Sequence, residues 1–384
     1  MPIFMEHERN YFIFTPLLAS TCVGTLEYRC ITESIQSAHP EIAFHQTKCS
    51  AIDFTKQELK LADGARVSYT TLVLAFGARS NTFGIPGVNE YTHPLKDIRD
   101  ARSIRSSLLN CLQRANIAVD PHQQRALLHF VIVGGGPTGV EFAAELHDFL
   151  HEDVIKFYPK LVPLVRITIF DVASRILGAF DERLAEYAKK VFTREGITVR
   201  TGTRVKSVAK SSIIVEDPQQ QSETVETGLI IWSTGLTSTE LAHLLPLEKD
   251  PHNHRLLTNQ YLQIPSHTNV YAIGDCSIII GNPLPCTAQV AKQQAQYLTV
   301  SFNNKEGAVV TNNPFIYRPM GMMAYLGEWR AIADLRNHKG ISGRAAWLVW
   351  RSVYFSMAVS LKNKILIPIY WLLTWLFGRD ITNL

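Results

Sequence analysis

The amino-acid sequence predicts an α/β fold in which one strand–turn–helix domain is inserted into a second α/β domain. Two observations predict the insertion: a glycine fingerprint follows a short apolar strand a third of the way along the chain, and two further strand-to-glycine-turn segments lie on either side of it. A third observation concerns the C-terminus. Four of the six tryptophans fall in the last 38 residues, which predicts aromatic-rich helices there.

Composition places the chain among folded proteins of two or three domains. It has 384 residues, of which 46% are hydrophobic and 19% charged. A net charge of +4 is too small to indicate nucleic acid as a partner. The six cysteines are scattered without a C-x-x-C pair, so we expect reduced thiols, no disulfide framework and no metal site.

The fingerprint lies in the segment HFVIVGGGPTGVEFAAEL, which begins at His129. The apolar run HFVIV predicts a buried parallel strand, and the residues after the glycines have helical periodicity. In G-x-G-x-x-G spacing the first glycine permits a tight turn, the second lets the backbone approach a pyrophosphate, and the third lets the helix pack on the strand. The phosphates are expected at the helix N-terminus. The expected dinucleotide-binding residues are Gly134, Gly136, Pro137, Thr138 and Gly139.

An acidic residue after the next strand supports dinucleotide binding over a purely structural glycine turn. The strand VRITIF ends before Asp171, where the ribose 2′-hydroxyl of NAD is expected. Asp171 lies 32 residues after Gly139, more than the usual spacing of about 20, so the segment HEDVIKFYPKLVPL is expected to intervene. A carboxylate there favours NADH over NADPH, although the nearby Arg175 weakens that preference.

The pattern then continues to about residue 245, with one helix, further strands and a hairpin-like pair. Upstream lies YTTLVLAFGARSNTFGIPG, a strand followed by a glycine turn, and downstream lies NVYAIGDC, followed by the helical run TAQVAKQQAQYLTVSF. These two flanking segments predict one outer domain whose chain leaves and returns around the inserted fingerprint domain.

The flanking segments resemble a known superfamily. LAFGARSNTFGIPG and VYAIGDC are similar to the two flavin motifs of the two-dinucleotide-binding-domain flavoproteins. The resemblance implies a Rossmann-like FAD domain with an inserted Rossmann-like NADH domain, and Asp275 at the flavin ribityl chain. From the residues alone, Asp275 could equally cap the following loop. The positions expected at FAD are Ala75, Gly77, Gly274 and Asp275.

Within that superfamily, five segments in order resemble the type II (alternative, rotenone-insensitive) NADH:quinone oxidoreductases, especially the mitochondrial ones. They are YFIFTPLLASTCVGTLEYR, FVIVGGGPTGVEFAAEL, FDVASRILGAFDE, AQVAKQQAQYL and GMMAYLGEWRAIAD. The resemblance implies hydride transfer from NADH to FAD, then two-electron transfer to ubiquinone or another membrane quinone, without proton pumping, in the respiratory chain. It also implies a homodimer bound peripherally to the mitochondrial inner membrane, on a side that the sequence leaves open.

The same resemblance assigns further site residues. It places Glu141 near the nicotinamide and flavin, Gly235 at the nicotinamide-side turn, Thr15 and Pro16 against the flavin, and Ala288, Gln289 and Gln293 beside the flavin and quinone. Gln289 and Gln293 are four residues apart and share a helix face. Plainer interpretations remain open. Glu141 could be an ordinary first-turn glutamate favoured by the helix dipole, Gln289 and Gln293 could form a polar helix face in solvent, and the segment at Thr15 could be a simple turn.

The family normally begins with a second G-x-G-x-x-G for the ADP half of FAD, and this sequence contains none. We therefore expect a truncated chain that lacks the front βαβ unit. The alternatives are an inactive, membrane-attached NAD-binding protein and a sulfide:quinone-type flavoprotein. A pyridine nucleotide-disulfide reductase would need a close cysteine pair, and Cys276 and Cys286 are too widely spaced.

At the C-terminus the longest apolar run, Ile365 to Phe377, has 13 residues and contains Pro368. A transmembrane helix needs about 20, so we expect two amphipathic helices lying in the membrane interface. The aromatic residues expected at headgroup depth are Trp347, Trp350, Tyr354, Tyr370, Trp371 and Trp375, and the cations expected to meet anionic lipid are Arg344, Arg351, Lys362, Lys364 and Arg379. Packing on the protein's own core or on a second subunit is the alternative. The expected domains are 1–125 (FAD-binding, first part), 126–248 (NADH-binding), 249–312 (FAD-binding, second part) and 313–384 (quinone access and membrane anchor).

Overall fold

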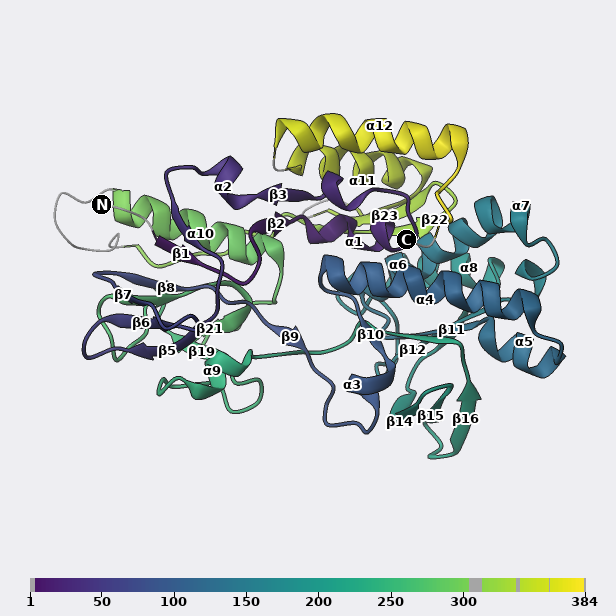
Figure 1. The fold of residues 1–384 in the computed structure, drawn as a ribbon, viewed down its shortest axis with the longest axis horizontal. Coiled ribbons are helices and arrows are strands. Elements are labelled where there is room, and N and C mark those ends of the chain that lie inside the picture. Colours follow the sequence, from purple (N-terminus) through teal and green to yellow (C-terminus); the bar gives the residue numbers. More distant parts are fainter. Residues whose placement is uncertain (1–3, 304–312, 336–338, 359, 383–384) are drawn as a thin grey trace. The chain divides into compact units, whose positions relative to one another are not determined.

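The computed structural model describes residues 4–303, 313–335, 339–358 and 360–382. The chain forms two compact units, each assembled from three separate segments. Unit 1 consists of Met1–Tyr11, Ser34–Asn81 and Leu236–Met320, and unit 2 of Phe12–Glu33, Thr82–Gly235 and Gly321–Leu384. Both units are mixed α/β structures (Figure 1). The boundaries of these two units differ from those of the four expected domains, which stay a prediction.

Unit 1 is built from small sheets and one long helix. The strand pair that matters for the site is β8 (Leu72–Leu74) with β20 (Val270–Ala272), which are parallel although about 200 residues separate them. The other strands are β1 (Phe4–Glu6), β4 (Ala43–His45), β5 (Cys49–Asp53), β6 (Glu58–Leu61), β7 (Arg66–Ser68), β9 (Arg79–Ser80), β18 (Leu236–Thr237), β19 (Leu256–Thr258) and β21 (Ser277–Ile279). The helices are α2 (Ile35–Ala38), α9 (Glu240–Leu244), η5 (Gly274–Cys276) and α10 (Ala288–Asn303).

Two apolar clusters hold unit 1 together. In one, alternating residues of β5, β6, β8 and β20 are buried against each other, as the period of two in strands requires. In the other, Tyr271 and Leu298 connect β20 with α10. The first cluster joins the segment before the fingerprint to the segment after it, whereas the second lies wholly within the segment after it.

Unit 2 contains a five-stranded parallel sheet in the order β10-β17-β11-β12-β13. Its central strand β11 (His129–Val133) is buried at every position, because helices and a second sheet cover both faces, and this explains its uninterrupted apolar sequence. The other strands of the sheet are β10 (His93–Pro94), β12 (Arg166–Phe170), β13 (Thr198–Arg200) and β17 (Leu229–Trp232). An antiparallel sheet adds β14 (Arg204–Ala209), β15 (Ser212–Glu216) and β16 (Ser222–Glu226).

The longest helix of unit 2 begins at a capping box. Asp97 accepts the N–H of Ile98, and Asp100 accepts the N–H of Asp97, so donors that the first turn leaves unpaired are satisfied. The helices before the C-terminal region are η1 (Thr15–Leu17), α1 (Leu18–Cys22), η2 (Tyr28–Cys30), α3 (Val88–Tyr91), α4 (Ile98–Ile117), α5 (Pro121–Leu127), α6 (Pro137–Phe149), η3 (Leu150–Val154), α7 (Ile155–Phe157), η4 (Val162–Leu164) and α8 (Glu182–Arg194). Two short paired strands, β2 (Tyr11–Ile13) and β3 (Thr32–Ser34), contain points where the chain passes between units.

The C-terminal region of unit 2 is an antiparallel sheet followed by two helices. The sheet consists of β22 (Met322–Gly327), β23 (Arg330–Asp334) and β24 (Ile341–Gly343), and β22 packs on α6. The helices α11 (Arg344–Met357) and α12 (Leu361–Phe377) lie along each other (Figure 1). Among the described residues, none of the helices combines the length and apolar character needed to cross a bilayer.

Burial of the C-terminal aromatic and basic residues corrects part of the sequence prediction. Trp350, expected at headgroup depth in a membrane, is only 4% exposed and packs inside unit 2. Arg379, expected to face lipid, is instead surrounded by carboxylates. The reason is that α11 packs on β23 and β24, so one side of it belongs to the protein core. Trp375 and Phe377 of α12 do remain exposed.

Candidate functional sites

The fingerprint turn connects β11 to α6, and a different physical constraint applies at each of its glycines. Gly134 has a φ of +114°, in the region that side chains rarely adopt. A Cβ at Gly139 would lie 2.0 Å from the carbonyl oxygen of Gly134, so the helix could not pack on the strand. A Cβ at Gly136 would meet nothing within 4 Å. The turn is therefore closed on the protein side and open at Gly136, where a ligand could approach.

Asp171, at the end of β12, is hydrogen-bonded to this turn. Its Oδ2 accepts the N–H of Gly135 at 2.5 Å, and its Oδ1 accepts the N–H of Ala173 at 2.7 Å. The carboxylate thus lies at the carboxyl edge of the sheet beside the fingerprint. The long spacing from Gly139 is explained by η3, α7 and η4, which occupy the predicted intervening segment.

A third strand end completes this edge of unit 2. Ser233 follows β17, and its hydroxyl donates to the carbonyl oxygens of Val133 and Gly134 at 3.0 and 3.2 Å. Gly235, two residues later, has a φ of +73°. The sequence prediction named Gly235 and missed Ser233, although its position after a buried strand could have indicated a contact at the shared sheet edge.

In unit 1 the two flavin-like motifs meet at the carboxyl ends of β8 and β20. The N–H of Ile273 donates to the carbonyl oxygen of Leu74 at 3.0 Å, which aligns the two strand ends. Beyond them, Gly77 and Gly274 both have positive φ values, of +67° and +70°. A Cβ at Gly77 would have open space around it. Ala75, Gly77, Gly274 and Asp275 therefore belong to two adjacent turns at one sheet edge, as parallel pairing requires.

Helix α10 is attached to the second of these turns by a glutamine that the sequence prediction missed. The Oε1 of Gln294, a residue only 3% exposed, accepts the N–H of Gly274 at 2.7 Å. Gln294 follows Gln293 in the predicted A-Q-x-x-x-Q-Q segment, and Ala288 is the first residue of α10. The Gly274 turn and the start of α10 thus form one bonded structure.

Gln289 and Gln293 lie on the same side of α10 and bond to the chain segment after it. Gln293 donates to the carbonyl of Arg318 and accepts its N–H, both at 2.9 Å. Gln289 accepts the N–H of Met320 at 3.1 Å. Both residues are half-buried, so the interpretation as a fully solvated helix face is wrong. Their expected contact with quinone stays a prediction.

Glu141 of α6 is a buried acid with two donors from the C-terminal region. It is 8% exposed, and its Oε1 accepts the backbone N–H of Tyr325 at 3.1 Å and the indole N–H of Trp350 at 3.2 Å. Burial raises the pKa of Glu141 to about 8, outweighing both hydrogen bonds. Glu141 is therefore neutral at pH 7, which distinguishes it from the solvated first-turn glutamate of the plainer interpretation.

Three further carboxyl groups follow Glu141 along the same side of α6 and η3, at helical spacing. Glu145 accepts the hydroxyls of Ser20 at 2.6 Å and Thr25 at 2.7 Å, and burial raises its pKa. Asp148 accepts the hydroxyl of Tyr325 at 2.5 Å. Glu152, the last of the series, is half-exposed. The sequence prediction missed this row, although the spacing of its acids along the fingerprint helix is visible in EFAAELHDFLHE.

The remaining predicted site residues are Thr15 and Pro16, in η1 of unit 2, where Pro16 occupies an early helical position that favours proline. Their contact with flavin stays a prediction.

No disulfide bond joins any of the six cysteines, all of which lie among the described residues.

Comparison with known proteins identifies the family. Residues 3–295 match the family model described as pyridine nucleotide-disulphide oxidoreductase, and residues 320–380 match the model of the NDH2 C-terminal domain. The mitochondrial internal alternative NAD(P)H-ubiquinone oxidoreductase A1 of Solanum tuberosum is 38% identical, over 98% of this chain and 82% of the relative. The chain belongs to the type II NADH:quinone oxidoreductases. The resemblance found in the sequence is confirmed.

Other type II NADH:quinone oxidoreductases agree with this assignment. The mitochondrial external alternative NADH-ubiquinone oxidoreductase of Yarrowia lipolytica is 35% identical over 98% of this chain and 75% of the relative. The structure of NDH2 from Plasmodium falciparum in complex with NADH has a TM-score of 0.93 at 27% identity, covering 99% of this chain and 94% of that chain. A sulfide:quinone oxidoreductase from Aquifex aeolicus, at 18% identity and a TM-score of 0.75, shares the fold.

Proposed function

We propose that this chain is a non-proton-pumping NADH:quinone oxidoreductase, which converts NADH, one proton and a quinone into NAD⁺ and the quinol. The observation that carries the proposal is the 38% identity to an alternative NAD(P)H-ubiquinone oxidoreductase along 98% of the chain. The geometry supports the proposal. Unit 2 contains a complete fingerprint turn, and unit 1 contains two adjacent glycine turns at the edge of a parallel strand pair.

NADH is assigned to the fingerprint turn of unit 2. The pyrophosphate would lie over the open position at Gly136, at the start of α6. There it would accept hydrogen bonds from the backbone N–H groups of Thr138 and Gly139, since Pro137 has no N–H. Asp171 would accept the ribose 2′-hydroxyl, since its carboxylate is fixed beside Gly135. The same fixed negative charge would repel a 2′-phosphate, which favours NADH over NADPH.

The flavin half of FAD fits the turns of unit 1. The open space at Gly77 lets a ligand approach the backbone, and Asp275 follows the turn that Gln294 holds. The residues of this chain include the glycine fingerprint for one dinucleotide only, so they do not account for the ADP half. When bound, the flavin accepts a hydride from NADH and passes two electrons to the quinone.

The protein supplies positioning and proton control in this scheme. A neutral Glu141 at pH 7 can hold a proton at its carboxyl group, and its two N–H donors fix the orientation of that group. Gln289 and Gln293 offer uncharged amides, suited to a quinone carbonyl because no buried charge is left behind. Thr15, Pro16 and Gly235 would line the bound cofactors.

The cellular setting is proposed from the relatives and from α12. The relatives with mitochondrial names support a mitochondrial location, and the exposed Leu372, Trp375 and Phe377 support peripheral attachment to the inner membrane through the C-terminal helices. Ubiquinone is the proposed quinone because the relatives' names specify it. A homodimer through the same region is part of the proposal.

The spectrum of the purified protein tests the function. A flavoprotein is yellow, and anaerobic addition of NADH should bleach its absorbance, which a quinone should then restore. The measurement compares these 384 residues with a version extended upstream. Gly139→Ala is the matched variant, because its Cβ would clash with the carbonyl oxygen of Gly134 and displace the start of α6, so NADH binding should be lost. An extended protein that is colourless and does not oxidise NADH would instead be a membrane-attached NAD-binding protein.

A further inference from the structure

One cavity of unit 2 is lined by two arginines that differ in their counter-ions. The cavity has a volume of about 610 Å³, opens to solvent, and is lined mainly by α6, η3, β22, α11 and α12. Arg379 lies at one side of it and Arg351 at another. Its walls are strongly aromatic, with Trp329, Trp347, Trp350, Trp371 and Trp375 among the lining residues.

Arg379 has three acidic neighbours. Its Nη1 donates to Glu152 at 2.7 Å and to Asp153 at 2.8 Å, and Glu145 lies 4.0 Å from Nη2. Burial opposes the charge of Arg379, but these three carboxylates together raise its pKa. The last acid of the lining, Asp148, accepts the Tyr325 hydroxyl. Every carboxylate of the cavity therefore already has a partner.

Arg351 has aromatic neighbours in place of a counter-ion. Its guanidinium lies 4.0 Å from the ring centre of Trp371 and 4.8 Å from that of Trp347. Within the described part of the chain, its N–H groups contact neither a carboxylate nor another hydrogen-bond acceptor. Burial lowers the pKa of Arg351 to about 10, so the group is still charged at pH 7. The two rings compensate part of the hydration that this cation loses, and an anion beside it would compensate more.

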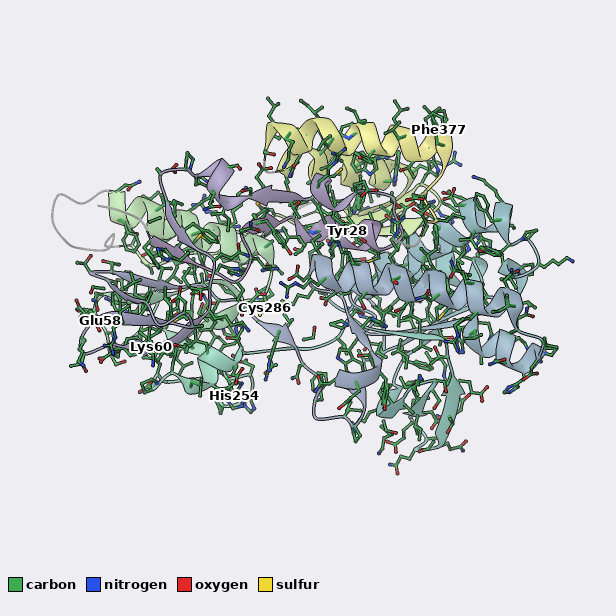
Figure 2. All side chains as sticks on the ribbon, in the orientation of Figure 1. Tyr28, Glu58, Lys60, His254, Cys286 and Phe377 are labelled. Atoms are coloured by element: carbon green, nitrogen blue, oxygen red, sulfur yellow. The ribbon has the colours of Figure 1, made fainter. Side chains whose placement is uncertain are left out.

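The shape of Arg351 and the rim of the cavity indicate the chemistry of that anion. A planar guanidinium fixed by two rings presents a fork of donors that matches two phosphate oxygens. The rim is apolar and exposed: Trp375 is 66% and Phe377 81% exposed, and Leu372 and Leu376 also line the cavity. Figure 2 shows Phe377 at the end of α12. A free phosphate would leave this rim in water, whereas a lipid phosphate continues into acyl chains that cover it.

We propose that this cavity binds the phosphate of an anionic membrane lipid at Arg351, with the acyl chains along the exposed apolar side of α12. The lipid would complete the ion pairing of the cavity and fix the C-terminal helices at the bilayer surface. The inference rests on the proposed membrane association and adds a specific site to it. A neutral quinone could accept a hydrogen bond from Arg351 but could not neutralise its charge.

A soluble lipid tests the site without a membrane. Dihexanoyl phosphatidylglycerol, below its micelle concentration, is titrated into the purified full-length protein by calorimetry, with dihexanoyl phosphatidylcholine, inorganic phosphate and a short-chain ubiquinone as separate probes. Arg351→Gln should weaken binding of the anionic lipid by about tenfold or more, because a charge-assisted pair is lost. Arg351→Lys should weaken it less, since it keeps the charge and loses the planar fork. Arg344→Gln, on the exposed side of the same helix, is the control for charge alone.

Vesicle flotation separates the site from general membrane attraction. The parent protein should bind vesicles containing phosphatidylglycerol in about 0.5 M salt, where the Debye length falls to about 4 Å, and Arg344→Gln should match it there. Arg351→Gln should remain weaker in high salt, because its site is desolvated. If the parent binds the soluble lipid and fails to bind any vesicle, the proposed membrane association fails and the lipid site stands.

Several results would overturn the lipid site. Equal losses for Arg351→Gln and Arg344→Gln would reduce it to surface charge. Binding of inorganic phosphate as tight as that of the lipid would exclude a lipid-specific site, and binding of ubiquinone in place of the lipid would assign the cavity to the substrate. A drop in melting temperature for Arg351→Gln with unchanged lipid affinity would make the arginine structural. A change from dimer to monomer with unchanged lipid affinity would assign the rim to a second copy of the chain.

Discussion

Helices α6 and α10 are each attached to a glycine turn at the carboxyl end of a parallel strand, α6 directly and α10 through Gln294, yet they carry different polar groups. α6 buries three carboxyl groups, Glu141, Glu145 and Asp148. α10 carries neutral amides, of which Gln294 holds the Gly274 turn and Gln293 holds Arg318. Amide side chains do not titrate, so their hydrogen bonds are the same at every ordinary pH. A carboxyl group does titrate, and its surroundings set the pH at which a buried one becomes charged. The difference predicts that, of these two helices, α6 responds to pH and α10 does not.

The largest effect is expected from removing the central acid of α6. Glu145→Ala leaves the hydroxyls of Ser20 and Thr25 without their acceptor and removes a nearby charge from Arg379. We expect unit 2 to lose about 4 kcal/mol of unfolding free energy, measured by urea denaturation at pH 7. Glu152→Ala is the control, because it removes a half-exposed acid from the same arginine and should cost about 1 kcal/mol or less. Equal losses would mean that burial is not what matters here.

A smaller effect, with a defined pH dependence, is expected for Glu141→Gln. The folded protein holds the Glu141 proton up to about pH 8, whereas the usual carboxyl releases it near 4.5. Stability contributed by this proton is therefore fully present below about 4.5 and is lost as the pH rises through about 8. The variant lacks this loss, so between pH 5 and 9 its stability should improve relative to the parent by about 4 kcal/mol. Parallel stability curves for the two proteins would refute the raised pKa.

On α10 the corresponding change should be smaller and independent of pH. Gln294→Ala leaves the N–H of Gly274 without its acceptor, and we expect a loss of about 2 kcal/mol in unit 1. The neighbouring variant Gln293→Ala affects a half-buried amide and should cost about 1 kcal/mol. Urea denaturation at pH 6 and pH 9 should give the same loss for each variant. A loss that changes with pH would remove the contrast between the two helices.

The smallest effect on stability is expected at the open glycine of the fingerprint. A Cβ at Gly136 meets no protein atom within 4 Å, so Gly136→Ala should change stability by about 0.5 kcal/mol or less. The methyl group would occupy the space assigned to the pyrophosphate, so NADH affinity should fall by about tenfold, measured by calorimetry. If Gly136→Ala binds NADH as well as the parent, the nucleotide does not lie at this turn.

Local patterns were sufficient to predict the turns and helices of both sites. The strand before Gly134, the helix after it and the acid at Asp171 all lie in short periodic segments, and so does the helix that begins at Ala288. The sequence also predicted that the two strands β8 and β20 belong to one outer domain, whereas their parallel pairing is known only from the structure.

The partners of the buried acids could not be predicted in the same way. Tyr325 and Trp350 reach Glu141 from 184 and 209 residues away, and nothing in their local sequence indicates a hydrogen-bonding role. Trp350 was expected in a membrane interface because aromatic residues with helical spacing look the same on a membrane face and on a core face. The prediction that Arg379 faces lipid was wrong because its carboxylate partners, such as Glu152, lie more than 200 residues earlier in the sequence.

The protonation state of Glu141 is the most direct test of this account. Infrared difference spectroscopy of the purified protein, titrated from pH 6 to pH 10, reports the carbonyl stretch of a neutral carboxylic acid, and Glu141→Gln identifies the band. We predict a band at pH 7 that disappears with a midpoint near pH 8 and is missing in the variant. A carboxylate signal for Glu141 at pH 7 would contradict the claim that α6 presents a neutral buried acid where α10 presents amides.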